Sequence, residues 1–522
     1  MTSTVFKKAI LVASAQVQYS RPSAALAFLS GVCDSVDLPH SIVDINIEIL
    51  KKHGHDVWFA MHNLIENPWS QWPQHLQTLG DRLLDDLVND MAQQQPDLIV
   101  ITVLSYMQQI WTQQFLLHLR KKLPTVIVIA GGPGIVTAAR YGPQHRNLSF
   151  GRWLIQEGLL DYFCMGEGEI VFAEFLKGQT QLPGLNNASS VDTWQPQLED
   201  LDLFPYPSYK KMQLDNYRTP KGSTRIIITG SRGCVRKCTF CDIEYHWPKY
   251  RYRRGEAVAN EILQHHLDIG IENFWFNDSL INGSLKNFRQ MLQLLRQYKH
   301  DTPSMKNLSI SGQFIIRPRG SHPESLYQEM QAAGITRLDT GIESGSEAVR
   351  DHMQKKFNNA DIDWHMEMCE KYGIQNWILL LIGYPTETQQ DFEMTLDLMR
   401  RYQKYIVNET IMGINLVNTL VLLPNSPLSN MSEDLMMEHD HLNYYKWISR
   451  KNPTLTLVER THRWIRAAET AMDLGYALPL EIMHNLERQY EFSSEQEQEL
   501  QQPRQPQNKS HRVIPIATEI YN

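Results

Sequence analysis

The chain contains 522 residues, more than one ordinary folding domain holds, and this length predicts roughly two to four domains. Hydrophobic residues make up 42% and charged residues 21%, which excludes a disordered or a fibrous chain. The net charge of -8 is not typical of a nucleic-acid-binding protein, so we expect no nucleic-acid partner. Six cysteines are too few for a disulfide scaffold.

The N-terminal segment has two competing interpretations. Lys7 and Lys8 precede a short apolar run at residues 9–15, which resembles the core of a signal peptide but equally a first buried strand. We interpret it as a strand, because the run is at the lower length limit of a signal peptide. No stretch reaches the ~18 apolar residues of a membrane-spanning helix. We therefore expect no membrane span and a cytoplasmic, reducing compartment, where clustered cysteines bind metal more often than they form disulfides.

The first 182 residues alternate strand-like and helix-like segments. A helix through Ile45, Ile49 and Leu50 is expected to stop at Gly54, and a second helix is expected over 81–94. Continuous apolar strands between amphipathic helices indicate a parallel sheet with both faces covered, that is, a doubly wound, Rossmann-like α/β domain over 1–182. The strands are expected at 9–13, 56–60, 98–104 and 126–130.

Prolines mixed with polar residues over 183–222 predict a connector, after which the alternation resumes. Six βα units over 223–430 predict a partial (βα)6 barrel of the TIM type, since eight units would take about 250 residues. Residues 431–522 are expected to be mostly helical, with a flexible tail near 495–508. The barrel strands are expected at 225–229, 273–277, 308–316, 336–342, 376–382 and 414–423, with helices at 256–267, 285–298, 324–333 and 391–401.

Three of the six cysteines, Cys234, Cys238 and Cys241, lie within one short segment after the first barrel strand. Thiolates at this spacing can bind one metal centre from a single loop. A structural zinc site would need a fourth ligand, for which His246 is the candidate. A four-iron cluster with three thiolates would instead leave one iron open to a small molecule. Because barrel chemistry lies at the carboxyl ends of the strands, the position of this loop favours the iron cluster.

The loop, with Phe240 directly before its third cysteine, resembles the radical S-adenosylmethionine (SAM) superfamily. Further segments similar to that family follow in the order that the family shows. Together they extend the resemblance over about residues 223–430. These segments are 274–278 at the second strand, 340–346 at the fourth, 383–385 after the fifth and 424–428 after the sixth.

The resemblance implies that the three cysteines hold a [4Fe-4S] cluster whose open iron binds SAM. One electron from an external donor such as flavodoxin or ferredoxin would then cleave SAM to a 5′-deoxyadenosyl radical, which removes a hydrogen atom from the substrate. Phe240 would pack near the adenine, while Asp278 and Glu343 would contact the SAM amino group and ribose. The alternatives are a turn residue for Asp278 and a solvated strand end for Glu343.

The N-terminal domain resembles the cobalamin-binding domains that precede many radical SAM cores. The resemblance implies that its cobalamin contacts come from the ends of consecutive strands and from a closing Gly-Glu segment. The Asp-x-His-x-x-Gly motif that supplies a lower axial histidine in many cobalamin enzymes is absent from residues 1–190, which leaves the lower ligand open. The implied cobalamin contacts are Ser105, Gly131, Gly132, Gly134, Gly166 and Glu167.

The remaining cysteines are expected to be structural. Cys369 lies on a predicted helix and is interpreted as a small buried hydrophobe. Cys33 and Cys164 provide no cysteine triplet for a second cluster, which disfavours the methylthiotransferase branch of the family. The segment 438–441 has metal-ligand residue types, but we expect a solvated loop there rather than a second metal site.

We therefore expect a cobalamin-dependent radical SAM methyltransferase that acts on an unactivated carbon of a small-molecule or peptide substrate. One alternative is a radical SAM enzyme that performs rearrangement or ring formation without methyl transfer. Another is a non-catalytic zinc- or cofactor-binding module. The identity of the substrate stays open at this stage.

Overall fold

The structure, a computed structural model, describes residues 4–15, 21–65, 67–139, 148–217, 224–423, 425–431, 435–436, 447–449, 451–479 and 482. The chain divides into two compact units. The first comprises Met1–Ile227 with Gln264–Asn273, and the second comprises Ile228–Leu263 with Phe274–Asn522. In the part of the chain that is described, no helix combines the length and the apolar character needed to cross a membrane.

The first unit is built on a six-stranded sheet of order β2-β1-β3-β4-β5-β6. Neighbouring strands from β2 to β5 are parallel, and β6 pairs antiparallel with β5 at the edge. The strand order reverses between β1 and β3, as in doubly wound domains. The predicted Rossmann-like class is thus confirmed, with strands β1 (Ala9–Ala13), β2 (His40–Asp44), β3 (Leu98–Thr102), β4 (Ile127–Gly131), β5 (Tyr162–Cys164) and β6 (Leu185–Asn186).

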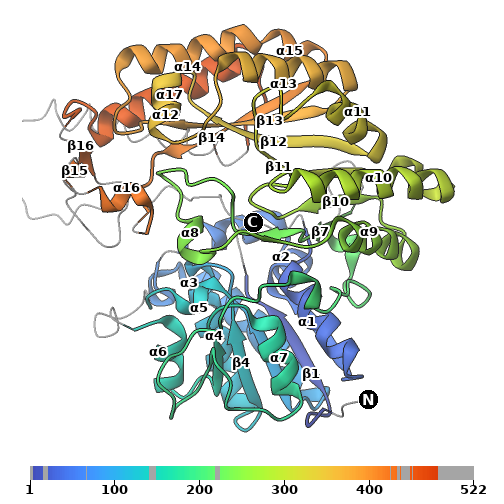
Figure 1. The fold of residues 1–522 in the computed structure, drawn as a ribbon. Helices are drawn as coiled ribbons and strands as arrows, with labels where there is room; N and C mark the ends of the chain where they lie inside the picture. The colour runs from blue at the N-terminus through green and yellow to red at the C-terminus, as the bar shows by residue number, and fades with distance from the viewer. Residues whose placement is uncertain are drawn as a thin grey trace, which may run out of the picture. The chain divides into compact units, whose positions relative to one another are not determined.

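Helices cover both faces of this sheet (Figure 1). Ile10 and Val12 of β1 and Ile99 and Ile101 of β3 point to one face, where they share a core with α2, α3, α4 and α6. Helices α1 and α7 pack against each other on the opposite face. The elements are α1 (Ala24–Ser35), α2 (Ile45–His62), α3 (Gln74–Gln93), α4 (Gln109–Lys122), α5 (Pro133–Val136), α6 (Phe150–Gln156), α7 (Gly168–Leu176), η1 (Trp69–Gln71), η2 (Tyr106–Gln108), η3 (Leu201–Leu203) and η4 (Leu214–Tyr217).

The predicted strand at 56–60 is wrong, because these residues form the second half of α2. Gly54 does interrupt the helix, with φ 77° and ψ 177°, but a further helical stretch follows directly. The apolar residues of this stretch are spaced for a helix, since Trp58 and Met61 lie one turn apart and both are buried. The second strand of the sheet is instead β2, which has only two apolar residues and therefore gives no strand signal in the sequence.

The second sheet has the order β14-β13-β12-β11-β10-β7, in which spatial order follows chain order. The strands from β11 to β14 are parallel. Helices α13, α14 and α17 lie along one face of this part of the sheet (Figure 1). The predicted partial barrel is confirmed, with strands β7 (Arg225–Ile228), β10 (Asn273–Phe276), β11 (Ser309–Phe314), β12 (Ile335–Glu343), β13 (Gln375–Ile382) and β14 (Ile411–Thr419).

The last barrel strand begins three residues and ends four residues before the predicted 414–423. Leu420 and Leu422, which look like strand residues in the sequence, are buried in irregular backbone beside Trp447. The intervening elements are α9 (Gly255–Ile269), α10 (Leu285–Asp301), η5 (Pro303–Asn307), α11 (Glu324–Ala333), α12 (Glu347–His352), α13 (Asn359–Tyr372), α14 (Gln389–Tyr402) and α15 (Lys404–Val407).

Two short antiparallel pairs complete the described chain. β8 (Ser231–Arg232) pairs with β9 (Arg251–Tyr252), and α8 (Ile243–His246) lies between them in sequence. After the barrel come α16 (Pro427–Asn430), β15 (Leu435–Met436), β16 (Ile448–Ser449) and α17 (Leu457–Asp473). The segment 438–441 and the tail at 495–508 lie outside the described residues.

Candidate active site

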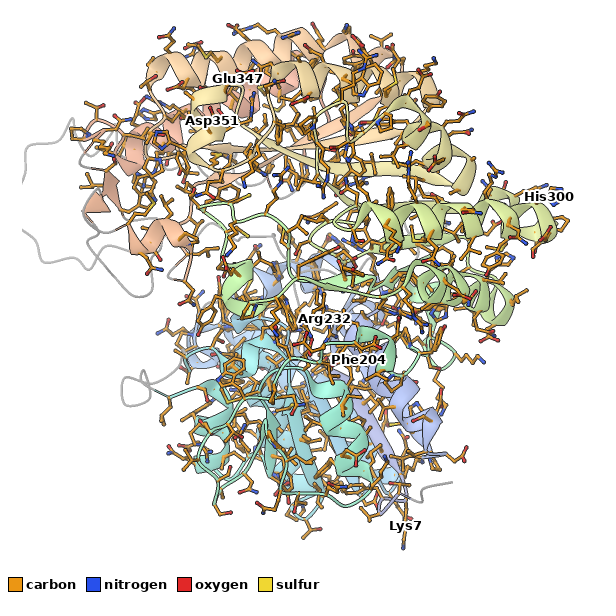
Figure 2. The ribbon with its side chains drawn as sticks, in the orientation of Figure 1. Lys7, Phe204, Arg232, His300, Glu347 and Asp351 are labelled. Atoms are coloured by element: carbon orange, nitrogen blue, oxygen red, sulfur yellow. The ribbon has the colours of Figure 1, made fainter. Side chains whose placement is uncertain are left out.

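The cysteine loop begins two residues after β7 and is closed at its base by the β8–β9 pair. Cys234, Cys238 and Cys241 are not in disulfide bonds and have intermediate exposure. The backbone N–H of Arg236 donates to Cys234 Sγ at 3.4 Å, and Cys241 N–H donates to the carbonyl of Cys238 at 3.1 Å. Arg232, labelled in Figure 2, stacks over Trp247 at 5.2 Å in the same segment.

Thr239 ties the middle of this loop to three distant segments of the barrel. Its N–H donates to Met353 O at 3.3 Å, and its own carbonyl accepts from Leu428 N–H at 2.7 Å. Its hydroxyl lies 2.8 Å from the hydroxyl of Tyr384. Tyr384 and Leu428 belong to two of the segments through which the sequence resembles the radical SAM family. The tertiary structure therefore brings those segments to the cysteine loop.

Asp278 holds the start of the loop. Its Oδ1 accepts from Gly230 N–H at 2.8 Å, and its Oδ2 accepts from the Ser231 hydroxyl at 2.7 Å. The side chain is buried, and burial raises its pKa to about 6. This geometry is the turn-holding alternative of the sequence analysis, while a contact between Asp278 and SAM stays a prediction.

Glu343 lies at the end of β12 and is buried, so it is not a solvated strand end. Its backbone has φ 68°, a left-handed conformation that non-glycine residues rarely adopt. Its Oε1 pairs with Lys355 Nζ at 2.7 Å, and the same ammonium donates to Gly341 O at 3.3 Å. Lys355 Nζ also lies 5.5 Å from the centroid of the Phe240 ring. Phe240 and Glu343, both predicted SAM contacts, therefore share one neighbour.

A further basic side chain, that of Arg317, lies near Cys234. Arg317 follows β11 and donates from Nη2 to the carbonyls of Asn282 and Gly283 at 3.2 and 3.0 Å. Both Arg317 and Lys355 act electrostatically on the cysteines of the loop. Three thiols amid positive charge suit an anionic iron–sulfur cluster, so the residues present fit that cofactor.

The zinc alternative requires a fourth ligand beside the three thiols. His246, the candidate fourth ligand, lies with Nε2 3.4 Å from Asp242 Oδ2. Among the residues described, no three His, Cys, Asp or Glu side chains come close enough together to hold a single metal ion. Thiolates that bind different irons of one cluster stand further apart than ligands that share one ion.

The predicted cobalamin contacts of the first unit lie at the carboxyl ends of β3, β4 and β5. Gly132 has φ 105°, and a Cβ there would lie 2.5 Å from Val103 O. A Cβ on Gly134 would lie 2.4 Å from Ser105 O, while Gly131 has room, with its nearest neighbour at 3.7 Å. Gly132 and Gly134 are thus required by close packing of the β4 turn on the chain that follows β3. Their contact with cobalamin stays a prediction.

Gly166 and Glu167 contact the polar segment that precedes the barrel. Gly166 has φ 96°, and a Cβ there would lie 3.0 Å from Gln195 O. Glu167 is buried and accepts from Leu198 N–H through Oε2 at 2.9 Å. The closing Gly-Glu segment therefore orders the chain that leaves the first unit, and its contact with cobalamin is untested.

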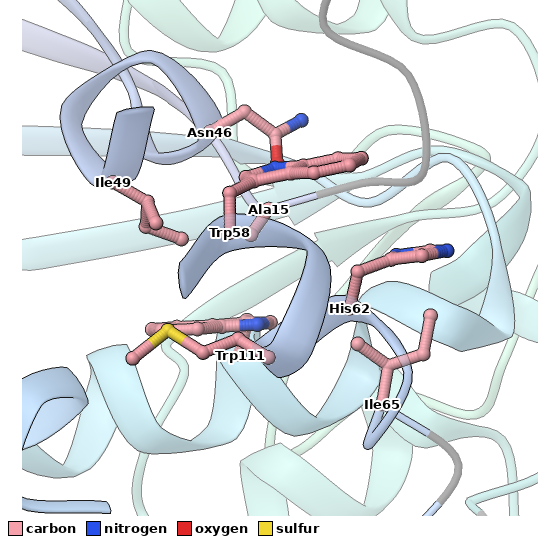
Figure 3. Close-up of a pocket in the computed structure, with 8 residues that line it drawn as sticks. Ala15, Asn46, Ile49, Trp58, His62, Ile65 and Trp111 are labelled. Atoms are coloured by element: carbon pink, nitrogen blue, oxygen red, sulfur yellow. The ribbon is translucent and has the colours of Figure 1, made fainter. Parts of the chain in front are cut away.

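A small aromatic pocket lies next to the end of β1, where the strand order of the first sheet reverses (Figure 3). Trp58 Nε1 donates to Asn46 Oδ1 at 3.0 Å, and the rings of Trp58 and His62 stack at 5.2 Å. The carboxyl edge at such a reversal is where open α/β sheets bind ligands. Sequence reasoning missed the pocket because it assigned 56–60 to a strand. The lining residues are Ala15, Asn46, Ile49, Trp58, Met61, His62, Ile65 and Trp111.

Residues 228–399 match the Radical SAM superfamily. This range contains the three loop cysteines together with Asp278, Glu343 and Lys355. The match therefore covers the cysteine loop and these neighbours, whereas Leu428 lies beyond it.

Two curated relatives are similar to parts of the chain. An uncharacterized methyltransferase of Pyrococcus horikoshii is 24% identical over 254 residues, which cover 46% of this chain and 53% of the relative. An anaerobic magnesium-protoporphyrin IX monomethyl ester cyclase of Synechocystis is 22% identical over 299 residues, which cover 55% and 56%. The chain thus spans about half the length of these relatives.

Two solved structures share the fold. The radical SAM methyltransferase TsrM of Kitasatospora setae, with cobalamin and a [4Fe-4S] cluster bound, has a TM-score of 0.57 at 16% identity, covering 83% of this chain and 81% of that one. The cobalamin-dependent SAM radical enzyme OxsB, with aqua-cobalamin bound, has a TM-score of 0.59 at 14% identity, covering 82% and 61%. At these identities the likeness concerns the fold.

Proposed function

We propose that this chain, a radical SAM enzyme, is a cobalamin-dependent methyltransferase that adds a methyl group to an unactivated carbon of a small-molecule or peptide substrate. The observation that carries the proposal is a doubly wound domain joined in one chain to a radical SAM barrel. The solved proteins that share both parts bind cobalamin and act with SAM. The Pyrococcus relative is also named as a methyltransferase.

In this proposal residues of the barrel bind the [4Fe-4S] cluster and SAM. Cys234, Cys238 and Cys241 would bind the cluster, and Asp278 would keep the loop in place through its bonds to Gly230 and Ser231. Phe240 and Glu343 would contact SAM. When bound, the cluster and SAM supply a hydrogen-abstracting radical, and cobalamin carries the methyl group. An electron donor such as flavodoxin or ferredoxin would reduce the cluster.

The first unit would hold cobalamin at the carboxyl edge of its sheet. Ser105 and the glycines after β4 lie at that edge, as does the pocket beside β1. Trp58 and Trp111, which line that pocket, are both buried. No residue of the first unit is proposed here as a ligand to cobalt.

A second candidate function is ring formation or rearrangement without methyl transfer. It is favoured by one observation, the similarity to a protein named as a cyclase. The two functions differ in what happens to SAM. Methyl transfer converts SAM to S-adenosylhomocysteine, whereas radical formation converts it to 5′-deoxyadenosine, so a methyltransferase that uses a radical forms both.

The test uses full-length protein purified without oxygen, with iron, sulfide and cobalamin quantified. Incubation with SAM and a one-electron reductant should yield both 5′-deoxyadenosine and S-adenosylhomocysteine. Formation of S-adenosylhomocysteine should depend on added cobalamin. Cys238→Ala is the matched control and should form no 5′-deoxyadenosine. Cobalamin that does not bind, or 5′-deoxyadenosine formed without S-adenosylhomocysteine, would contradict methyl transfer and favour the second function.

A further inference from the structure

Lys355 places its ammonium group in a largely buried position, where a charge loses most of its contact with water. Its side chain is 13% exposed, and that of its partner Glu343 is 10% exposed. The adjacent Lys356 is exposed to solvent. Burying an unpaired ammonium costs several kcal/mol, so such a group persists only with well-placed partners. The Glu343 carboxylate at 2.7 Å and the Gly341 carbonyl at 3.3 Å supply them.

The ammonium of Lys355 faces the cysteine loop. Nζ lies 5.5 Å from the ring of Phe240, the residue before Cys241. Burial by itself lowers the pKa of Lys355, but Glu343 and the thiols of Cys238 and Cys241 act in the opposite direction, and the net pKa is raised. The side chain is therefore a cation at neutral pH, and it acts on Cys234 as well.

The backbone that presents Lys355 also anchors the cysteine loop. Lys355 N–H donates to Arg350 O at 3.0 Å at the end of α12, and Met353 O accepts from Thr239 N–H at 3.3 Å. The outer face of α12 carries the exposed carboxylates Glu347 and Asp351, both labelled in Figure 2. The loop and the lysine thus share one support on the barrel.

Gly341 leaves the space in which the ion pair lies. A Cβ at this position would lie 2.5 Å from Glu343 Oε1 and 3.0 Å from Lys355 Nζ. Both atoms are the ends of flexible side chains. An alanine at position 341 would therefore displace the ion pair without requiring the strand backbone to move.

We infer that Lys355 is a positioning residue of the radical SAM site, whose ammonium holds the Glu343 carboxylate and places a fixed positive charge beside the three loop thiolates. The inference rests on the radical SAM assignment and not on methyl transfer. A reduced cluster carries one more negative charge than an oxidised one, so a nearby cation favours reduction. The positive charge of Lys355 therefore favours transfer of an electron to the cluster, and the ion pair orients Glu343.

The charge is tested with the full-length chain and a reconstituted cluster, by a redox titration followed by electron paramagnetic resonance. Lys355→Met should lower the ratio of reduced to oxidised cluster at a fixed potential about tenfold, equivalent to a potential about 59 mV more negative. Lys355→Arg should restore most of the shift, and Lys356→Met should leave the potential unchanged. A Lys355→Met protein with full iron content and an unshifted potential would overturn the inference.

The orienting role is tested separately with Gly341→Ala, which keeps every charge. Equilibrium binding of SAM to the oxidised cluster should weaken about tenfold, as for loss of one charge-assisted hydrogen bond, while the potential without SAM stays that of the parent. Unchanged SAM affinity would overturn the role of the ion pair. Neither measurement involves cobalamin or a methylated product, so failure here is distinguishable from failure of the proposed function.

Discussion

Single buried charges decide the local structure of both units, because each must find a partner when it leaves water. Glu343 is paired with Lys355, and Asp278 accepts from two groups of the cysteine loop. In the first unit Asp44 caps α2 by accepting from Asn46 N–H at 3.0 Å and accepts the Tyr217 hydroxyl at 2.8 Å. Asp44 has no cation among its partners in these bonds, and this makes its ionisation unfavourable.

We expect Asp44→Asn to flatten part of the pH dependence of unfolding. Burial raises the pKa of Asp44 from 3.8 to about 6, so the folded state keeps a proton that the unfolded state loses in that window. The contribution of Asp44 to the free energy of unfolding is therefore greatest below pH 3.8. It falls by about 3 kcal/mol as the pH rises through about 6. Denaturant titrations of the parent and the variant at intervals from pH 4 to 7 would measure this fall in the free energy of unfolding.

Asp56→Asn is the matched control for this prediction, because Asp56 is exposed. Its pH dependence of unfolding should equal that of the parent protein. If Asp44→Asn and the parent lose stability equally between pH 4 and 6, the buried carboxyl is not the source of the slope.

At the scale of elements, α2 is interrupted within its length. The helix begins at the Asp44 cap, breaks at Gly54 and continues to His62. The break lets residues on both sides of it, such as Ile49 and Trp58, line one pocket (Figure 3). A φ of 77° with a ψ of 177° is a conformation that only glycine adopts readily.

We expect Gly54→Ala to destabilise the protein by about 1–3 kcal/mol through backbone strain. Crowding makes no contribution, because a Cβ at Gly54 would have no atom within 4 Å. Gly320→Ala is the control, since that glycine is also in open space but has no positive φ. Thermal or denaturant unfolding should show the difference, and equal stabilities for the two variants would refute the strain argument.

At the scale of the whole molecule, the two compact units carry separate candidate cofactor sites. The predicted cobalamin contacts Ser105, Gly131 and Gly134 belong to the first unit, and the cysteine loop belongs to the second. The two sets of residues have no member in common, and substitutions that share no partners are usually independent of each other. Each cofactor should therefore be removable without loss of the other.

We expect Gly131→Val to lower cobalamin retention about tenfold or more while iron content and 5′-deoxyadenosine formation stay at the parent level. A Cβ at position 131 fits the fold, because the nearest atom to its position lies at 3.7 Å. Cys238→Ala should show the reverse pattern, losing iron but keeping cobalamin. Cofactor quantification on both purified variants decides the matter, and loss of both cofactors in either variant would contradict independent sites.

Much of this protein follows from local sequence. The spacing of Cys234, Cys238 and Cys241 predicts a shared metal centre. Apolar patterning predicts β1, β3, β4, the six strands of the barrel sheet and several helices, with α11 correct at both ends. These signals are local, because the period of a strand or helix and the reach of a loop depend on neighbouring residues only. The same local reading fails at β2, whose two apolar residues are only partly buried and whose buried residues are the polar His40 and Asp44.

Only the tertiary structure shows which charged side chains lie at the cysteine-loop site. Lys355 and Lys356 are adjacent and chemically identical, yet one lies beside the cysteine loop with Glu343 and the other lies in solvent. Likewise, nothing in the local sequence shows that Tyr384 and Leu428 meet Thr239. Burial of a charge depends on groups far away in the chain, because the cost of desolvation is offset only by partners that the completed fold places. The sequence therefore determined which candidate metal-binding residues are present, and the fold determined which cation stands beside them.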